Sequence, residues 1–162
     1  MERKYEDYEL ELDLPSNWFL LSPKKYKDFG IVNSELLEVI EAFAVKGEKE
    51  FENVVSFYYC DEKDFDALNF EINIQKINGF YETQENKIII KDLYDYEFKN
   101  KLGMIAIISQ VGNEEVYIMQ VYFKFRGNIF CFNAYITEPL ETEEQLEENA
   151  MFKTIKEIID EI

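Results

Sequence analysis

The sequence predicts an α+β fold in which helices pack against an antiparallel sheet, and three observations lead to this prediction. Residues 8–14 alternate between apolar and acidic side chains, which is the period of a half-buried strand. Gly112-Asn113 and Gly127-Asn128 each lie between apolar runs, as hairpin turns do. An apolar stripe with helical spacing closes the chain. We therefore expect an antiparallel sheet with a C-terminal three-strand meander at about 104–137, a central helix at about 34–46 and a C-terminal helix at about 143–162.

The composition indicates one acidic globular domain. The chain has 162 residues and a mass of 19.4 kDa, with 34 Asp+Glu against 17 Lys+Arg and a formal charge of −17. Apolar residues make up 47% of it, which is enough to form a core at this length. We expect residues 1–162 to form a single domain. The chain has no run of about 20 apolar residues and no signal-like opening, so we expect a cytoplasmic protein without membrane insertion.

The absence of histidine narrows the chemistry. It removes Ser-His and Cys-His dyads, histidine-ligated zinc and the usual general base at neutral pH. Cys60 and Cys131 are far apart and form no CxxC pair, so we expect reduced core thiols. The negative charge and the lack of a Lys/Arg cluster disfavour nucleic acid and anionic membranes as partners. We expect neither a metal site nor a cofactor.

The first third of the chain gives a strand, a break and a helix. Pro15-Ser16-Asn17 ends the strand of residues 8–14, and the apolar run Trp18–Leu21 either pairs back or tucks under the sheet. Asn33-Ser34 suits the N-cap of the central helix, and Gly47 suits its end. The apolar positions of this helix follow the expected spacing: Leu36, Leu37, Ile40, Phe43 and Ala44.

The middle of the chain predicts three strands, at Val54–Cys60, Asn69–Ile77 and Lys87–Lys91. In the second of these, apolar and polar side chains alternate clearly. Residues 92–98 fit either a strand or a short helix, and both alternatives stay open at this point.

The two Gly-Asn dipeptides set a register for the meander if each is a two-residue loop. The resulting cross-strand pairs are Phe125–Phe130, Phe123–Phe132, Val121–Ala134, Met119–Ile136, Ile108–Tyr117 and Ala106–Met119. All of these side chains then share one apolar face. A slip of one residue would move a whole strand's side chains to the other face, so agreement across both turns favours the meander.

The reverse face of the meander mixes apolar, aromatic and amide side chains. We favour a face that is partly covered by the chain's other helix, with polar residues at its rim. The alternative is an open protein-binding face, because tyrosine supplies apolar area together with a hydrogen bond. The candidate contacts on such a face are Gln120, Tyr122, Asn133 and Tyr135.

The closing helix begins at a capping-box pattern, Thr142-Glu143-Glu144-Gln145. Its apolar stripe consists of Leu146, Met151, Ile155, Ile158, Ile159 and Ile162. We expect this stripe to cover the apolar face of the meander at Met119, Val121 and Phe123.

The order of these elements resembles the PsbP-like superfamily. Leu14-Pro15-Ser16-Asn17-Trp18 is similar to the Leu-Pro-x-x-Trp opening of many bacterial members, and Phe152-Lys153-Thr154-Ile155 resembles their closing Phe-x-x-Ile helix. Between them come the central helix and a meander ending in Gly127-Asn128-Ile129-Phe130. The resemblance implies an antiparallel sheet flanked by helices and a non-catalytic binding role, with no catalytic residues to carry over. In the Eag-type effector chaperones of this superfamily the sheet holds the client, which would correspond here to Gln120, Tyr122, Asn133 and Tyr135.

Carboxylates are the remaining source of catalytic chemistry, and a carboxylate-dependent hydrolase is the least favoured of the functions that we consider. With 34 Asp+Glu some pairing is inevitable, and no spacing fixes two carboxylates across a substrate as a hydrolase requires. Residues 95–99 are similar to the acidic-plus-lysine constellation of metal-dependent nucleases, but the aspartate is too close to the Glu-x-Lys element. The glutamates of residues 141–148 have no glycine turn of the calcium-loop type.

We therefore expect a non-catalytic protein that binds another protein, with an acidic surface that steers a basic partner; the alternative use of the charge is solubility alone. An immunity protein or a chaperone or adaptor for a secreted effector fits best, and a small-molecule or lipid-segment binding module is the runner-up. Further candidate contacts are two tyrosines set among carboxylates and four glutamates of the last helix: Tyr94, Tyr96, Glu143, Glu144, Glu147 and Glu148.

Overall fold

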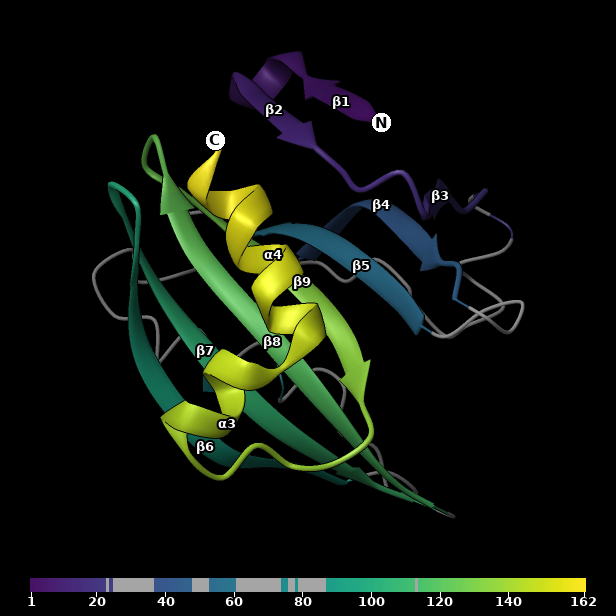
Figure 1. The fold of residues 1–162 in the computed structure, drawn as a ribbon, viewed down its shortest axis with the longest axis vertical. Helices are drawn as coiled ribbons and strands as arrows, with labels where there is room; N and C mark the ends of the chain where they lie inside the picture. The colour runs from purple at the N-terminus through teal and green to yellow at the C-terminus, as the bar shows by residue number, and fades with distance from the viewer. Residues whose placement is uncertain are drawn as a thin grey trace.

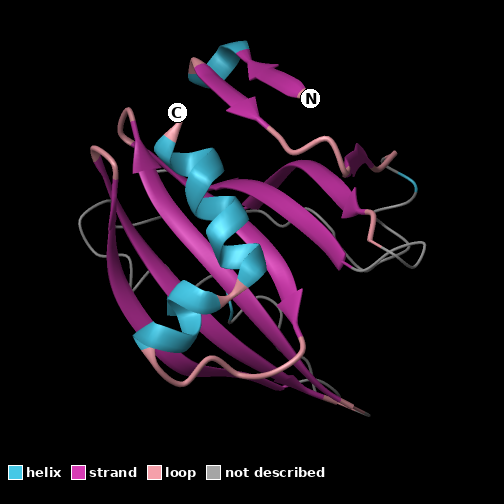
Figure 2. Ribbon diagram, viewed as in Figure 1, coloured by secondary structure: helices cyan, strands magenta, loops and turns pink. Residues whose placement is uncertain are grey.

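The computed structural model describes residues 1–22, 24, 37–47, 53–60, 74, 75, 78, 87–112 and 114–162. Its centre is a twisted antiparallel sheet of seven strands in the order β3-β4-β5-β9-β8-β7-β6 (Figures 1 and 2). The strands are β3 (Trp18–Leu20), β4 (Leu37–Val45), β5 (Asn53–Cys60), β6 (Lys87–Phe98), β7 (Lys101–Val111), β8 (Glu115–Phe125) and β9 (Asn128–Ile136). Two helices, α3 (Glu143–Glu148) and α4 (Ala150–Asp160), lie across one face of the sheet, which we name the front face.

A separate two-stranded ribbon begins the chain. It consists of β1 (Glu2–Tyr5), a 3-10 turn η1 (Glu6–Tyr8) and β2 (Leu10–Asp13), and it lies near the end of α4 (Figure 1). The predicted alternation is confirmed, because Leu10, Leu12 and Leu14 are buried in the front core. Arg3 and Tyr5 both donate to the Glu41 carboxylate, with 3.1 Å between Arg3 Nε and Glu41 Oε2, so the ribbon is held to β4.

The α+β class and the C-terminal meander are confirmed, but the closing helix is divided in two. Thr142 caps α3 by accepting a hydrogen bond from the Gln145 backbone at 3.1 Å. Asn149 has an extended backbone, ends α3, and accepts the Phe152 N–H at 2.9 Å to begin α4. Since Asn favours caps over helix interiors, this residue explains the break.

The predicted central helix at about 34–46 is wrong for residues 37–45, which form β4; residues 34–36 lie outside the described part of the chain. The run from Val39 to Val45 is almost wholly apolar because both faces of this strand are buried. A short apolar run of this kind cannot be distinguished from a buried helix by periodicity alone. The bulge between Val39 and Glu41 further breaks the strand alternation.

The strand predictions in the middle of the chain have mixed outcomes. The strands at 54–60 and 87–91 are confirmed, and residues 92–98 continue the second as part of β6. Of the predicted strand Asn69–Ile77, Ile74 and Gln75 are helical, so the prediction is wrong there; its other residues are outside the described ranges.

In the hairpin between β8 and β9 the side chains lie on the predicted faces of the sheet, but the cross-strand pairs differ from the predicted ones. The turn consists of Arg126 and Gly127, with φ of 49° and 81°, rather than Gly127 and Asn128. Phe123 consequently lies opposite Phe130 instead of Phe132. A shift of two residues returns every side chain to the same face, so the apolar face survives the error.

The hairpin between β7 and β8 is off by one residue, and that error changes faces. Val111 pairs with Glu115, which makes the loop three residues long. Ile105 and Ile107 therefore face the helices, whereas Ala106 and Ile108 lie on the reverse or back face. Because β7 is apolar on both sides, its sequence could not fix the register.

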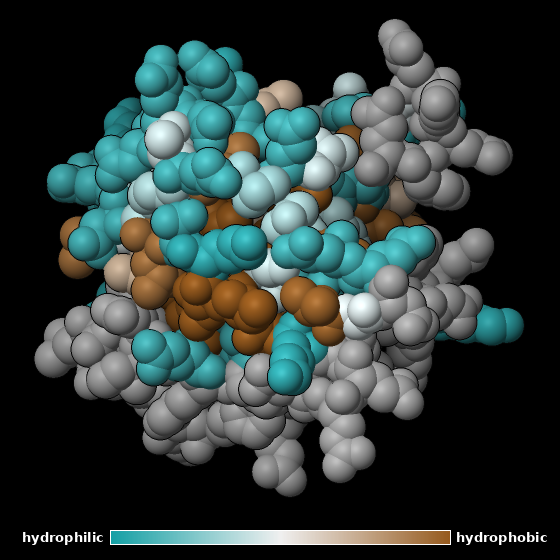
Figure 3. Space-filling view, turned by 90° about the horizontal axis from the view of Figure 1, so that it is seen from below, coloured by the Kyte–Doolittle hydropathy of each residue, from teal (hydrophilic) through white to brown (hydrophobic). Residues whose placement is uncertain are grey.

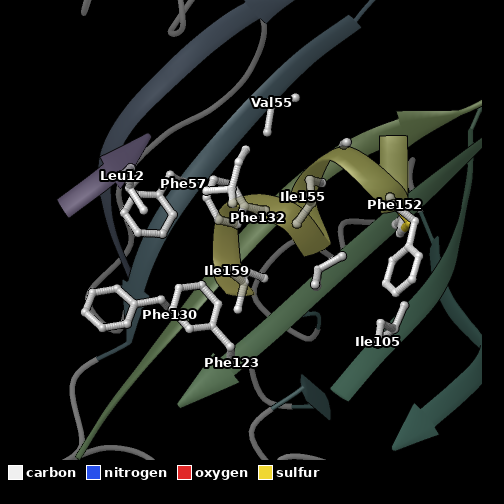
Figure 4. Packing of buried hydrophobic residues seen from close by; sticks show 14 of the residues in the cluster. Leu12, Val55, Phe57, Ile105, Phe123, Phe130, Phe132, Phe152, Ile155 and Ile159 are labelled. Carbon is white, nitrogen blue, oxygen red and sulfur yellow. The ribbon is translucent and has the colours of Figure 1, made fainter. Parts of the chain in front are cut away.

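The front core lies between the sheet and α4. Phe57, Phe123, Phe130 and Phe132 stack in one group, with ring centroids 4.7–6.2 Å apart along its contacts. Figure 4 shows Ile155 and Ile159 of α4 beside these rings, and all of these side chains are fully buried. The predicted cover of Met119, Val121 and Phe123 by the last helix is confirmed.

The back face has a second core. Its buried members are Val39, Tyr58, Ile74, Ala106, Ile108, Ile118, Tyr122, Ile129 and Cys131, whose sulfur is a thiol. Ile74 lies in none of the sheet strands, so a segment outside the sheet covers the middle of this face. The reverse face is therefore partly covered, as predicted, but the cover includes Ile74 and is not the predicted central helix, whose residues 37–45 form β4.

Candidate functional site

The four predicted glutamates of α3 form an exposed acidic surface. Glu143, Glu144, Glu147 and Glu148 are all exposed, and none of them forms an ion pair with a residue that the structure describes. Leu146 is the buried residue of this helix and anchors it to the front core. The helix therefore presents its carboxylates outward at the lower end of the molecule (Figure 1).

Tyr94 and Tyr96 lie beneath this acidic surface and hold it in place. The Tyr94 hydroxyl donates to the Leu140 carbonyl at 3.1 Å, just before α3. The Tyr96 ring packs edge-on against Phe152, with centroids 5.2 Å apart. Burial, and then a hydrogen bond to the Glu147 carboxylate, raises the pKa of the Tyr96 hydroxyl above its usual range. Both tyrosines thus contact other parts of the chain itself: Tyr94 the segment before α3, and Tyr96 the helix α4.

Gln120 and Tyr122 lie inside the molecule, 3% and 0% exposed, in a hydrogen-bonded cluster. The Asn78 amide donates to Gln120 Oε1 at 3.0 Å and the Gln120 amide returns a bond to Asn78 Oδ1 at 3.2 Å. The Tyr122 hydroxyl also donates to Gln120 Oε1, at 2.9 Å, and Asn78 donates to the Ile74 carbonyl at 2.8 Å. As surface contacts these two residues are wrong, because they join the sheet to the segment that covers it.

Asn133 and Tyr135 remain accessible on the back face. Tyr135 is 40% exposed and Asn133 is partly buried. The Asn53 side chain brackets the Tyr135 backbone, accepting its N–H at 3.2 Å and donating to its carbonyl. The structure therefore separates the predicted residues into a front group at α3 and a back group at β9, on opposite faces of the sheet.

Sequence reasoning missed an apolar surface beside α3. Ile89, Val111, Tyr117 and Ile136 lie in two neighbouring rows at the lower end of the front face, and we name them the ledge. Ile89 is 48% exposed and Val111 is 38% exposed. Figure 3, which views the molecule from below, shows apolar surface bordered by hydrophilic residues at this end. The run Ile88-Ile89-Ile90 was an available signal, because a strand must turn its middle residue to the opposite face.

The described residues show no grouping typical of a metal centre or a carboxylate hydrolase. Among them, no three His, Cys, Asp or Glu side chains gather to hold a metal ion. Hydrogen bonds from Ser109 and Tyr117 lower the pKa of Glu115. Burial acts to raise the pKa of Asp160, but hydrogen bonds from Lys156 and the Lys99 backbone lower it overall. A general acid needs a raised pKa, so neither carboxyl group suits that role. No helix in the described part of the chain is long and apolar enough to span a membrane.

The geometry defines an α+β protein whose antiparallel sheet carries a helix pair on one face. A solution structure of cyanobacterial PsbP (CyanoP) from Synechocystis sp. PCC 6803 is similar to this chain, with a TM-score of 0.63 and 10% identity over 98% of this chain and 89% of that one. The chain therefore has a PsbP-like fold, as its motifs predicted.

A crystal structure of the Pseudomonas aeruginosa protein of unknown function PA94 is similar at a TM-score of 0.43 and 15% identity, over 100% of this chain and 94% of that one. That score is too low to support any argument about this chain. No protein-family model matches the sequence, and no curated protein matches it either.

Proposed function

We propose that this protein is a non-catalytic binding protein and that its partner is a basic protein that approaches the acidic surface of α3. One observation carries the proposal: four glutamates project from a short, firmly anchored helix without an ion pair to any described residue. Unneutralised carboxylates gathered on one surface raise the association rate of a cationic partner. The net charge of −17 extends this field over the whole molecule.

The finer role that we propose is that of a cytoplasmic immunity protein, or of a chaperone or adaptor for a secreted effector. An acidic protein that binds a basic toxin or effector masks the positive charge of that partner until the partner is released. This role needs no catalysis, so it suits a chain without histidine or other evident catalytic groups. The PsbP-like fold supports this role only as a scaffold, because one fold serves many functions.

A small-molecule or lipid-segment binding role is the second candidate, and one observation favours it. Ser56 on the back face is 1% exposed, and its hydroxyl has no hydrogen-bond partner in the described structure. Ser56 lies opposite Asn133, which in turn lies opposite Gln120, so a polar row crosses three strands. A bound polar group could satisfy the Ser56 hydroxyl, whose isolation otherwise costs stability.

The leading proposal is tested by charge removal. A variant with Glu143, Glu144, Glu147 and Glu148 changed to Gln keeps helix propensity and removes four charges. Once affinity purification from the native host has identified a partner, stopped-flow mixing should show a slower association rate for this variant and a steep fall with salt for the wild type.

The matched control removes the same charge at the opposite end of the molecule. Glu2→Gln, Glu6→Gln, Asp7→Asn and Asp13→Asn change four exposed carboxylates of the N-terminal ribbon. If both variants slow association equally, net charge rather than α3 guides the partner. Equal rates for all three proteins, insensitive to salt, would show that the charge serves solubility alone.

A further inference from the structure

We infer that the ledge is the site at which aliphatic side chains of a cationic partner segment dock. The inference rests on the proposed function and adds to it the place and the chemistry of contact. Charge on α3 can speed an encounter, but a lasting complex needs buried apolar contacts near the centre of the interface. The ledge is an apolar surface on the same face of the sheet as α3, and Glu141, just before α3, acts electrostatically on its Tyr117.

The ledge has the make-up of an interface centre. Ile89 on β6 and Val111 on β7 are diagonal neighbours, since Ile89 pairs with Ser109 and Lys87 pairs with Val111. The row of Ile89 continues through Ser109, which is buried, to Tyr117 and Ile136, so an isoleucine lies at each end of the row and the tyrosine lies between them. Two exposed aliphatic residues beside a tyrosine can bury apolar area and still offer a hydrogen bond.

A network of polar side chains holds this surface in one arrangement. The Glu115 carboxylate accepts a hydrogen bond from the Ser109 hydroxyl at 2.8 Å and another from Tyr117, and Lys91 Nζ lies 3.8 Å from it. The same Lys91 ammonium lies 5.7 Å from the centre of the Tyr117 ring. Because these side chains are already ordered, docking costs less conformational entropy.

The surrounding charge decides which segment fits. Glu114, Glu115 and Glu141 are exposed around the ledge, together with Lys87 opposite Val111 and Lys91 beside Glu115, so the excess of negative charge comes from Glu141 and the neighbouring α3. Glu141 lies close enough to Tyr117 to act on its hydroxyl electrostatically. Through Glu141 the rim joins the acidic surface of α3. A second copy of this chain would bring another −17 charges to the contact and is disfavoured. A segment with lysine or arginine flanking two aliphatic residues matches both the rim and the centre.

Three synthetic twelve-residue peptides test the inference: one with lysines and isoleucines, one with each isoleucine replaced by serine, and one with each lysine of the first replaced by glutamate. Fluorescence anisotropy measures their binding to the full chain. We expect the lysine-isoleucine peptide to bind about tenfold tighter than the lysine-serine peptide, because one aliphatic contact is worth about that much. The glutamate peptide should not bind.

Variants locate the contact. Ile89→Thr with Val111→Thr keeps β-branched side chains and should abolish the tenfold advantage of isoleucine. Leu102→Thr is the control, because Leu102 is 64% exposed on the back face at the other end of β7, and it should leave the advantage intact. Charge-dependent binding without an isoleucine advantage, or an advantage that survives in the double variant, would overturn the ledge while leaving the proposed function standing. Equal binding of lysine and glutamate peptides would count against the proposed function itself.

Discussion

The centre of the front face is wholly apolar, whereas the back face has a buried polar cluster at its centre. On the front, stacked phenylalanines meet the isoleucines of α4. On the back, Gln120, Tyr122 and Asn78 exchange hydrogen bonds within an apolar surround. Apolar contacts stabilise without direction, so they tolerate alternative registers. A buried amide pair is satisfied in one alignment only, so we infer that the back cluster specifies where the covering segment lies.

Ile155→Ala is the largest expected effect and tests the front face. Ile155 is fully buried between α4 and the phenylalanine group, so its truncation leaves a cavity. We expect a loss of about 2–5 kcal/mol in the free energy of unfolding, measured by urea titration. Met151→Ala, at a partly buried position of the same helix, should cost clearly less. A loss for Ile155→Ala below about half a kcal/mol would mean that α4 contributes little to the front core.

Gln120→Leu tests the back face, with a smaller expected effect. It removes the acceptor that Gln120 offers to the Tyr122 hydroxyl and to one Asn78 amide proton, and the donor that Gln120 offers to Asn78 Oδ1, which should cost about 1–3 kcal/mol in the same titration. Adding Tyr122→Phe removes one of the three groups that lose their Gln120 partner, so the double variant should recover part of the loss. If Gln120→Leu is neutral, the cluster does not specify the alignment and the contrast between the faces disappears.

Ser56→Ala tests the back face by an expected gain in stability rather than a loss. Within the described structure the Ser56 hydroxyl is buried without a partner, which is a cost that the front core does not carry. Its removal should raise the free energy of unfolding by about 1 kcal/mol. A loss of similar size would show instead that the hydroxyl has a partner in solution, and it would favour the second candidate function.

The same contrast explains how far the sequence could predict the fold. Leu10, Leu12 and Leu14 were placed correctly because they alternate with exposed carboxylates. β7 was placed on the wrong face because Ile105 to Ile108 are buried on both sides, so no alternation exists to fix the register. β4 was mistaken for a helix for the same reason. A sequence pattern therefore predicts a strand well when one face is buried and the other exposed, and poorly when both faces are buried.

Turns and candidate contacts show a second limit. Arg126 adopts a left-handed backbone that glycine or asparagine normally favours, so the Gly-Asn dipeptide located the hairpin but misplaced its turn by one residue. The exposed position of the α3 glutamates agrees with the capping box, whereas their role as contacts stays a prediction. The prediction of Gln120 and Tyr122 as surface contacts is wrong because Asn78, which binds Gln120 and so buries this cluster, is far away in the chain. The ledge was missed because its members come from four strands.

The smallest expected effect is at Asp160. This residue tests whether charge contributes, besides apolar burial, to holding α4 on the front face. Its carboxylate accepts the Lys99 N–H at 2.8 Å and pairs with Lys156 at 2.6 Å, joining the end of α4 to the turn between β6 and β7. Because its folded pKa is lowered, its contribution is fully present above the unfolded value, about 3.9, and is lost as the pH falls through the folded pKa.

The variant Asp160→Asn keeps the acceptor for the Lys99 N–H and removes only the charge. At pH 7 the wild type should be more stable than this variant by about 0.3–0.5 kcal/mol, as for other ion pairs one helical turn apart. Below the folded pKa the wild-type carboxyl is also neutral, so the difference should vanish. Urea titrations at pH 7 and at a falling series of pH values below the unfolded pKa of about 3.9 measure it. A difference that persists at the lowest pH would mean that Asp160 acts through packing, as the apolar contacts of the front face do.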